Sequence, residues 1–182
     1  FKNAEDPKTN FDICYAVSMC FLFASSLPSG ILMDKCGGRA CGVVGALMAS
    51  VGLLLMGAAT TFPAQWDWLM FYGYPMATAG GMINSLCMYT FIWLLPDRAN
   101  LVTGIAGGIA SLSDTCALLA VWLHDIYGVP IAWFFFGLSV LALAAAAVSQ
   151  LVVPSLEFSM ECARLMAPEA ILAEEAAEAG AA

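Results

Sequence analysis

The chain has 182 residues, of which 62% are hydrophobic and 11% are charged, and its formal net charge is −8. Soluble domains contain about 45–50% apolar and about 25% charged residues, so this composition excludes an ordinary soluble fold as well as a disordered chain. Nucleic-acid binding is excluded too, because it needs a basic surface and the chain has only six Lys and Arg residues. We therefore expect an integral membrane protein.

Five apolar stretches are long enough to cross a bilayer, which takes about 20 mostly apolar residues in a helix. Short polar connections separate them, so consecutive helices should run antiparallel. The sequence predicts an all-α membrane protein in which a five-helix transmembrane domain (11–153) follows a polar N-terminal segment (1–10) and precedes an acidic Ala/Glu-rich tail (154–182). The predicted spans are residues 11–33, 40–62, 68–95, 101–124 and 131–153.

Cations and aromatic residues beside these spans predict their orientation and depth, because Lys and Arg favour the cytoplasmic side and Trp and Tyr favour the interfaces. The side with more cations holds Lys35, Arg39, Arg98 and Arg164, and the other side holds Lys2 and Lys8. We therefore expect the first and third connections and the tail on the cytoplasm-equivalent side. The aromatic residues near span ends are Trp66, Trp68, Trp93, Trp122, Tyr127 and Trp133.

The connection between the first two spans carries a charged motif, GILMDKCGGR over residues 30–39. It resembles the loop signature of the major facilitator superfamily, G-x-x-x-D-[RK]-x-G-x-[RK], which joins the second and third helices of that fold. The chain departs from the pattern at Gly38, where many members carry a second cation. The matching residues are Gly30, Asp34, Lys35, Gly37 and Arg39.

A second turn supports this resemblance, because Pro96, Arg98 and the glycines that follow are similar to the family's turn from the fourth to the fifth helix. Residues 27–30 and the pair Asp114-Thr115 are similar to its system-L-like amino-acid transporter branch. The resemblance implies that the five spans are helices two to six of the N-terminal six-helix half. The first helix and the second half of that fold would then belong to a missing part of the protein or to a partner chain.

Asp114 is the most informative polar residue inside a span, because an ionised carboxylate there costs roughly 2.5–3.5 kcal/mol on insertion scales. It should face a cavity, a partner or a polar neighbour, and both Ser111 and Thr115 could hydrogen-bond to it. Asn84, in the middle of the third span, could line the same interior. These four residues are candidates for a substrate pathway, and the simpler alternative is that they hydrogen-bond between helices.

The charged motif has two interpretations as well. In the superfamily it locks the two halves together on the cytoplasmic side, with its acid facing a helix N-terminus of the second half. Alternatively, it survives here as a stable turn with an internal pair between Asp34 and Arg39. Within the third span, residues 73–75 (Gly-Tyr-Pro) should interrupt the helix, because Pro75 lacks a backbone donor. Three stripes of small residues should allow close helix packing, namely Gly104/Gly108, Gly45/Ala49 and Ala142/Ala146.

The sequence shows no nucleophile–base pair, phosphate-binding loop or metal-ligand spacing, so we expect neither catalytic residues nor a metal site nor enzyme activity. His124, the only histidine, is better explained as a hydrogen-bonded interfacial residue than as a ligand of chlorophyll or haem. We expect no cofactor, but bound lipid, and pigment if the protein belongs to a photosynthetic complex.

Two functions remain open at this stage. The chain either belongs to a secondary transporter that moves a small solute by alternating access, or it is a transport-inactive accessory subunit of a larger respiratory or photosynthetic membrane complex. Both predict a multi-pass protein in contact with the lipid bilayer and with other membrane chains. The Ala/Gly-rich composition of the tail separately points to an organellar (plastid or mitochondrial) membrane. Only the first predicts a small-molecule substrate.

Overall fold

The computed structural model describes residues 7–94, 98–155 and 157, and every regular element within these ranges is helical. This confirms the predicted all-α fold class for the described part of the chain. Residues 1–6 of the polar N-terminal segment and nearly all of the acidic tail lie outside it. The elements are α1 (Pro7–Thr61), the short α2 (Pro63–Trp66), the 3-10 turn η1 (Asp67–Leu69), α3 (Met70–Leu94), α4 (Ala99–Tyr127) and α5 (Ile131–Val152).

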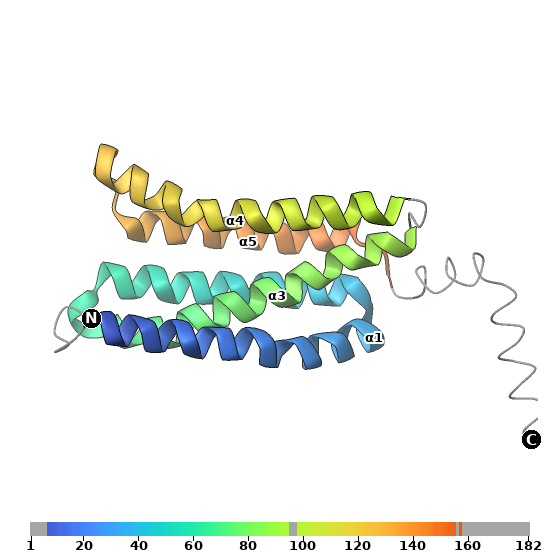
Figure 1. Cartoon of the computed structure of the whole chain (residues 1–182), viewed down its shortest axis with the longest axis horizontal. Coiled ribbons are helices and arrows are strands. Elements are labelled where there is room, and N and C mark those ends of the chain that lie inside the picture. Colours follow the sequence, from blue (N-terminus) through green and yellow to red (C-terminus); the bar gives the residue numbers. More distant parts are fainter. Residues whose placement is uncertain (1–6, 95–97, 156, 158–182) are drawn as a thin grey trace, which may run out of the picture.

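α1 consists of two helices that meet at Gly37, whose backbone has φ 80° and ψ 172°. The first half of α1 starts near the N-terminus and crosses the molecule, and the second half returns beside it (Figure 1). We predicted a polar connection over residues 34–39, but only Gly37 departs from helical geometry. A single residue suffices because glycine, with no Cβ, adopts a conformation that is nearly closed to other residues.

The remaining long helices continue the alternation of direction, so that each runs opposite to the one before it (Figure 1). Their bounds lie within three residues of the predicted spans. The predicted interruption of the third span at residues 73–75 is wrong, because α3 stays helical through Pro75. Just beyond this proline, the Thr78 hydroxyl group lies 3.1 Å from the carbonyl oxygen of Tyr74 and 2.9 Å from that of Pro75.

The second half of α1 lies at the centre of the bundle, with α3 packed on one side and α5 on another. Glycines bring its backbone close to that of α3. A Cβ atom added to Gly45 would lie 2.3 Å from the backbone nitrogen of Asn84, and one added to Gly80 would lie 2.3 Å from that of Ala49. The close approach predicted for the Gly45–Ala49 stripe is therefore present, and its partner is the Gly80 face of α3.

α5 packs against the same central helix through small and hydroxyl side chains. The hydroxyl oxygens of Ser50 and Ser139 lie 2.8 Å apart, and the Ser139 hydroxyl also donates a 3.1 Å hydrogen bond to the carbonyl oxygen of Ser50. Gly42 approaches Ser149 so closely that an added Cβ would lie 2.8 Å from the Ser149 hydroxyl oxygen. The α1–α5 interface is thus held by hydrogen bonds and close packing.

The described bundle differs from a soluble bundle in the side chains that it buries completely. The largest fully buried side chains are those of Cys41 and four serines, whereas leucines and aromatic residues are exposed along every long helix; Leu151, for example, is 84% exposed. Soluble proteins bury large apolar residues in water-excluding cores. Helices in lipid instead associate through small residues and interhelical hydrogen bonds, because lipid is as apolar as a leucine side chain.

Two helical stretches in the described part of the chain are long and apolar enough to cross a membrane, rather than the five that we predicted. They are Asp12–Thr61, with 50 residues, and Ile131–Val152, with 22. The first contains the reversal at Gly37. Ile131–Val152 is little buried within the bundle, since only 11% of its most apolar stretch is buried.

Candidate functional site

The charged motif forms the reversal between the two halves of α1, at the end of the bundle where α4 begins and α5 ends (Figure 1). Gly37 supplies the positive φ angle of the turn. The neighbouring Gly38 is buried against Thr90 of α3, and a Cβ atom on it would lie only 1.8 Å from the Thr90 hydroxyl oxygen. A side chain at residue 38 would therefore fit only if Thr90 moved.

The three charged residues of the motif have different environments. The Arg39 Nε group donates a 2.8 Å hydrogen bond to the carbonyl oxygen of Val153, at the C-terminal end of α5. Asp34 and Lys35 are exposed. All three residues belong to the described part of the chain, and no ion pair joins Asp34 to Arg39. The internal pair that we considered is thus replaced by a contact between the turn and α5.

Gly30, the remaining glycine of the motif, and the second predicted turn contribute less to the structure at this end of the bundle. Gly30 has open space around the position of a Cβ atom, so neither packing nor a positive φ angle requires glycine there. Arg98 is exposed at the residue that precedes α4. Pro96, with which it was predicted to form the turn, lies outside the described residues.

Asn84 lies in the middle of α3, against the second half of α1, and is half-buried. Its side-chain oxygen Oδ1 is buried and has no hydrogen-bond partner among the described residues. Ser85, next to it, is exposed and bonds at 2.8 Å to the carbonyl oxygen of Gly81 within its own helix. An unpaired buried amide oxygen is costly, so Asn84 has an unused capacity to accept a hydrogen bond.

The other three candidate pathway residues belong to α4. The structure assigns Ser111, Asp114 and Thr115 to one continuous helix with Ala99 and Tyr127 at its ends. Their side chains lie outside the described part of the structure. That Asp114 faces a cavity, or bonds to its two neighbours, therefore remains a prediction.

The opposite end of the bundle carries five of the six aromatic residues predicted near span ends, and the side chain of the sixth, Trp93, lies outside the described part of the structure. Trp66, Trp68, Trp122, Tyr127 and Trp133 are all exposed there. His124 is also exposed, and its Nδ1 atom lies 2.9 Å from the carbonyl oxygen of Val129. The hydrogen bond predicted for this histidine is thus present, and its place at a membrane interface stays a prediction.

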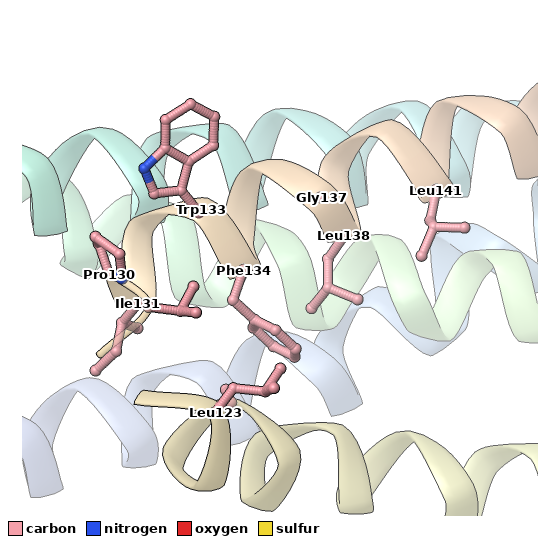
Figure 2. Close-up of a pocket in the computed structure, with 10 residues that line it drawn as sticks. Leu123, Pro130, Ile131, Trp133, Phe134, Gly137, Leu138 and Leu141 are labelled. Atoms are coloured by element: carbon pink, nitrogen blue, oxygen red, sulfur yellow. The ribbon is translucent and has the colours of Figure 1, made fainter. Parts of the chain in front are cut away.

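Two cavities near this histidine were not predicted from the sequence. One, of about 330 Å³, is a groove between α4 and α5 (Figure 2). The other, of about 680 Å³, is lined in part by Thr60, Thr61 and His124. Threonines near the end of a span carry no distinctive sequence signal, and neither cavity could be recognised before the helices were packed.

In the part of the chain that the structure describes, no group of three or more His, Cys, Asp or Glu residues is placed to hold a metal ion. Comparison with known proteins identifies no relative, since no protein-family model, no curated protein and no solved structure matches the chain.

Proposed function

We propose that this chain is a membrane-embedded five-helix bundle that forms part of a secondary transporter for a small solute and works together with further transmembrane helices. Membrane insertion is supported by the distribution of side chains, with serines such as Ser50 and Ser139 each 1% exposed and large apolar side chains on the surface. An aqueous environment would strongly disfavour so much uncovered apolar surface.

The lengths of the helices support five spans. Each half of the 50-residue stretch Asp12–Thr61 is long enough to cross a bilayer on its own, and the reversal at Gly37 separates the two halves. α5, with 22 residues, is the other strongly apolar helix. α3 and α4, with 25 and 29 residues, are long enough as well and run antiparallel to their chain neighbours. The bundle would thus place the motif and the start of α4 on the same membrane face.

The single observation that carries the transporter proposal is the form of the charged motif. It makes a sharp reversal between two span-length helices, with Gly37 in the conformation that requires glycine. Arg39 is hydrogen-bonded to the C-terminal end of α5, whereas Asp34 and Lys35 are exposed at the same end of the bundle. An exposed acid at this position suits the role that the superfamily resemblance implies, in which it faces the positive end of a helix in a second transporter half.

Asn84 and Asp114 are the proposed pathway residues. The side-chain oxygen of Asn84 is buried without a hydrogen-bond partner in the described bundle, so it could accept a hydrogen bond from a substrate. Asp114 is a carboxylate within a helix of 29 residues, and such groups in membranes are retained for substrate, ion or proton pathways. In two-half transporters the substrate site lies near the midplane, so a second set of helices would complete it.

Membrane insertion can be tested with two cysteines of the first half of α1. Cys36 and Cys20 are both exposed on the bundle, but Cys36 precedes the reversal whereas Cys20 lies in the middle of the helix. With Cys116 and Cys162 replaced by serine, a membrane-impermeant maleimide should label Cys36 in vesicles opened to both faces and leave Cys20 unlabelled. In detergent-free aqueous solution a soluble bundle would expose both, so equal labelling in vesicles overturns insertion.

Transport is tested by the composition of the native assembly. The protein is extracted in mild detergent, its native mass is measured and every co-purifying chain is identified. A single species that carries further transmembrane helices supports the transporter, and substrate uptake by that species should then fall with Asp114→Asn and Asn84→Ala. Recovery only within a large multi-subunit complex contradicts transport and favours the accessory-subunit alternative.

A further inference from the structure

We propose that the partner of this bundle is a second copy of the same chain, related to the first by a two-fold axis parallel to the helices. This inference rests on the proposed function, which requires further transmembrane helices, and it names the chain that supplies them. The contact would join the first half of α1 (residues 7–36) in one copy to α4 in the other, twice in each dimer.

These two helices lie on opposite edges of the bundle. The first half of α1 forms one edge and α4 forms the other, with α3 between them (Figure 1). In the described part of the chain, α4 packs on α3 and α5 and on no other helix. A two-fold rotation about an axis parallel to the helices exchanges the two edges and keeps the charged turn at the same end. The first half of α1 then meets α4 of the second copy, and the two helices are antiparallel.

The two edges carry exposed charges of opposite sign at this end. Asp34 is exposed at the end of the first half of α1, and Arg98 is exposed at the residue that precedes α4. Among the described residues, neither side chain has an ion-pair partner. Exchange of the edges brings each Asp34 to the Arg98 of the other copy, so the surface is self-complementary, as a two-fold interface requires. The carboxylate would also lie near the first turn of α4, where the helix dipole favours a negative charge.

A row of exposed apolar side chains continues from Asp34 along α1. Residues three and four apart share one face of a helix, and the row occupies the face opposite the buried Ser18 and Ser29. Large side chains that point away from their own bundle are available to a partner. The exposed fractions along this row are 56% for Ile31, 77% for Leu27 and 71% for Phe23.

α4 carries a matching row that starts at Arg98. Leu101 and Ile105 follow it at spacings of three and four residues and are 54% and 55% exposed. Gly108 comes next and has open space around the position of a Cβ atom. On an ideal helix the row on α1 is about 16 Å long and the row on α4 about 15 Å, so the two rows match in length.

Aligned at their charged ends, the two antiparallel rows pair residue by residue. Phe23, the largest side chain of its row, then meets Gly108, and such small residues permit close packing of membrane helices. Neither a lipid nor an arbitrary apolar helix supplies a charge of the right sign at the matching end, whereas this chain carries both halves of the contact. The pairs, with the residue of the second copy given last, are Asp34 with Arg98, Ile31 with Leu101, Leu27 with Ile105, and Phe23 with Gly108.

The second copy would also complete the proposed substrate site. α3 lies between the two edges, so it would face its own copy across the two-fold axis (Figure 1). Each α3 carries Asn84 near its middle. The site would thus be enclosed by the same helices from both copies, in the way that two-half transporters bind substrate between their halves.

The first test cross-links the two rows in vesicles that hold the full chain at a high lipid-to-protein ratio. The background has Cys20, Cys36, Cys116 and Cys162 replaced by serine. One chain carries Ile31→Cys, a second chain with a different tag carries Leu101→Cys, and copper phenanthroline oxidises adjacent thiols to a disulfide. We expect a cross-linked species that contains both tags and has twice the mass of the chain.

The matched control replaces Leu101→Cys with Leu151→Cys, because Leu151 is 84% exposed near the same end of the bundle but belongs to α5. Ile31→Cys alone is a second control, since the two-fold axis places both copies of residue 31 at opposite edges of the dimer. We expect both controls to cross-link several-fold less. Equal cross-linking of the test pair and the controls would show random collision and overturn the proposal.

The second test reverses the charges. A two-fold dimer holds the ion pair twice, so Asp34→Arg or Arg98→Asp should each weaken association in vesicles roughly tenfold, measured by energy transfer between labelled chains. The double variant retains a reversed pair and should restore most of the affinity. Lys35→Asp is the control, because it changes the charge by the same amount as Arg98→Asp on a neighbouring face. Failure of the double variant to restore association would overturn the pairing of Asp34 with Arg98.

The remaining outcomes separate this inference from transport. The cross-link without substrate uptake would confirm the second copy and contradict transport. Uptake by an assembly in which a different chain cross-links to residue 31 would support transport and overturn the second copy. A ladder of larger cross-linked species would indicate an open row of copies and overturn the two-fold arrangement.

Discussion

Arg39 and Val153 join the charged turn to α5 at one end of the described bundle, since the Arg39 Nε group donates a 2.8 Å hydrogen bond to the Val153 carbonyl oxygen across 114 positions of sequence. Val153 is the C-terminal cap of α5. The last carbonyl groups of a helix lack partners within the helix and carry a partial negative charge, so a guanidinium group there satisfies one of them and complements the helix dipole. The charged turn is thereby attached to α5.

Arg39→Leu should lower the free energy of unfolding by about 1 kcal/mol, a value reduced from that of a buried charged hydrogen bond because Arg39 is half-exposed. Thermal unfolding in mild detergent, followed by circular dichroism, measures the change. Arg98→Leu is the control, because it removes the same charge at the same end of the bundle from an exposed site. Equal effects of the two substitutions would mean that charge alone, and not the Val153 contact, matters.

Gly37→Ala should lower the free energy of unfolding by about 1–3 kcal/mol, because the backbone at φ 80° and ψ 172° is strained for any residue with a Cβ. Gly30→Ala should be neutral or slightly stabilising, since Gly30 is helical and has open space around it. Chemical unfolding of both variants in the same detergent measures the difference. A Gly37→Ala protein as stable as the Gly30→Ala protein would contradict the reversal at residue 37.

Gly80→Ala should destabilise the α1–α3 interface by about 3 kcal/mol. Its Cβ would lie 2.3 Å from the backbone nitrogen of Ala49, and a backbone atom cannot move aside as the end of a side chain can. Gly81→Ala, one residue further on, has open space and should gain up to about 1 kcal/mol in helix propensity. The pair is compared by unfolding in detergent, and similar stabilities would refute the close approach of these helices.

Ser50 and Ser139 should show an energetic coupling of about 0.6 kcal/mol, and at most about 1.7 kcal/mol, in a double-mutant cycle of alanine substitutions. The coupling arises because their hydroxyl groups bond to each other across the α1–α5 interface. The Ser18 hydroxyl bonds only to the Cys14 carbonyl oxygen of its own helix, so a cycle of Ser18→Ala with Ser139→Ala should be additive. Additivity in the first cycle would exclude the interhelical bond.

The positions of the helices could be predicted from the sequence to within a few residues, because the length of an apolar run and the short polar breaks between runs are local properties. α5, expected over residues 131–153, is observed at Ile131–Val152. The motif could likewise be located at a turn, because glycines and charges interrupt the apolar pattern there. Pro75 was misjudged because α3 continues through the missing backbone donor.

The candidate site was predictable only in part. Asn84 could be singled out as a polar residue in a span, but its unpaired oxygen became visible only once α3 packed on α1. The partner of the Gly45 stripe was not predictable either, since several helices carry small residues and Gly104 and Gly108 turn out to face open space. Nothing in the sequence marked Val153 as the partner of Arg39.

The sequence by itself determined that the described chain is helical, where its helices begin and end, and that the turn between the first two contains glycine and charge. These properties depend on interactions within a few residues of one another. Only the tertiary structure decided that Gly45 meets Gly80, that Arg39 caps α5, and that Thr60, Thr61 and His124 share a cavity. The reason is that small side chains permit close packing without specifying a partner, so the choice depends on how all the helices fit together.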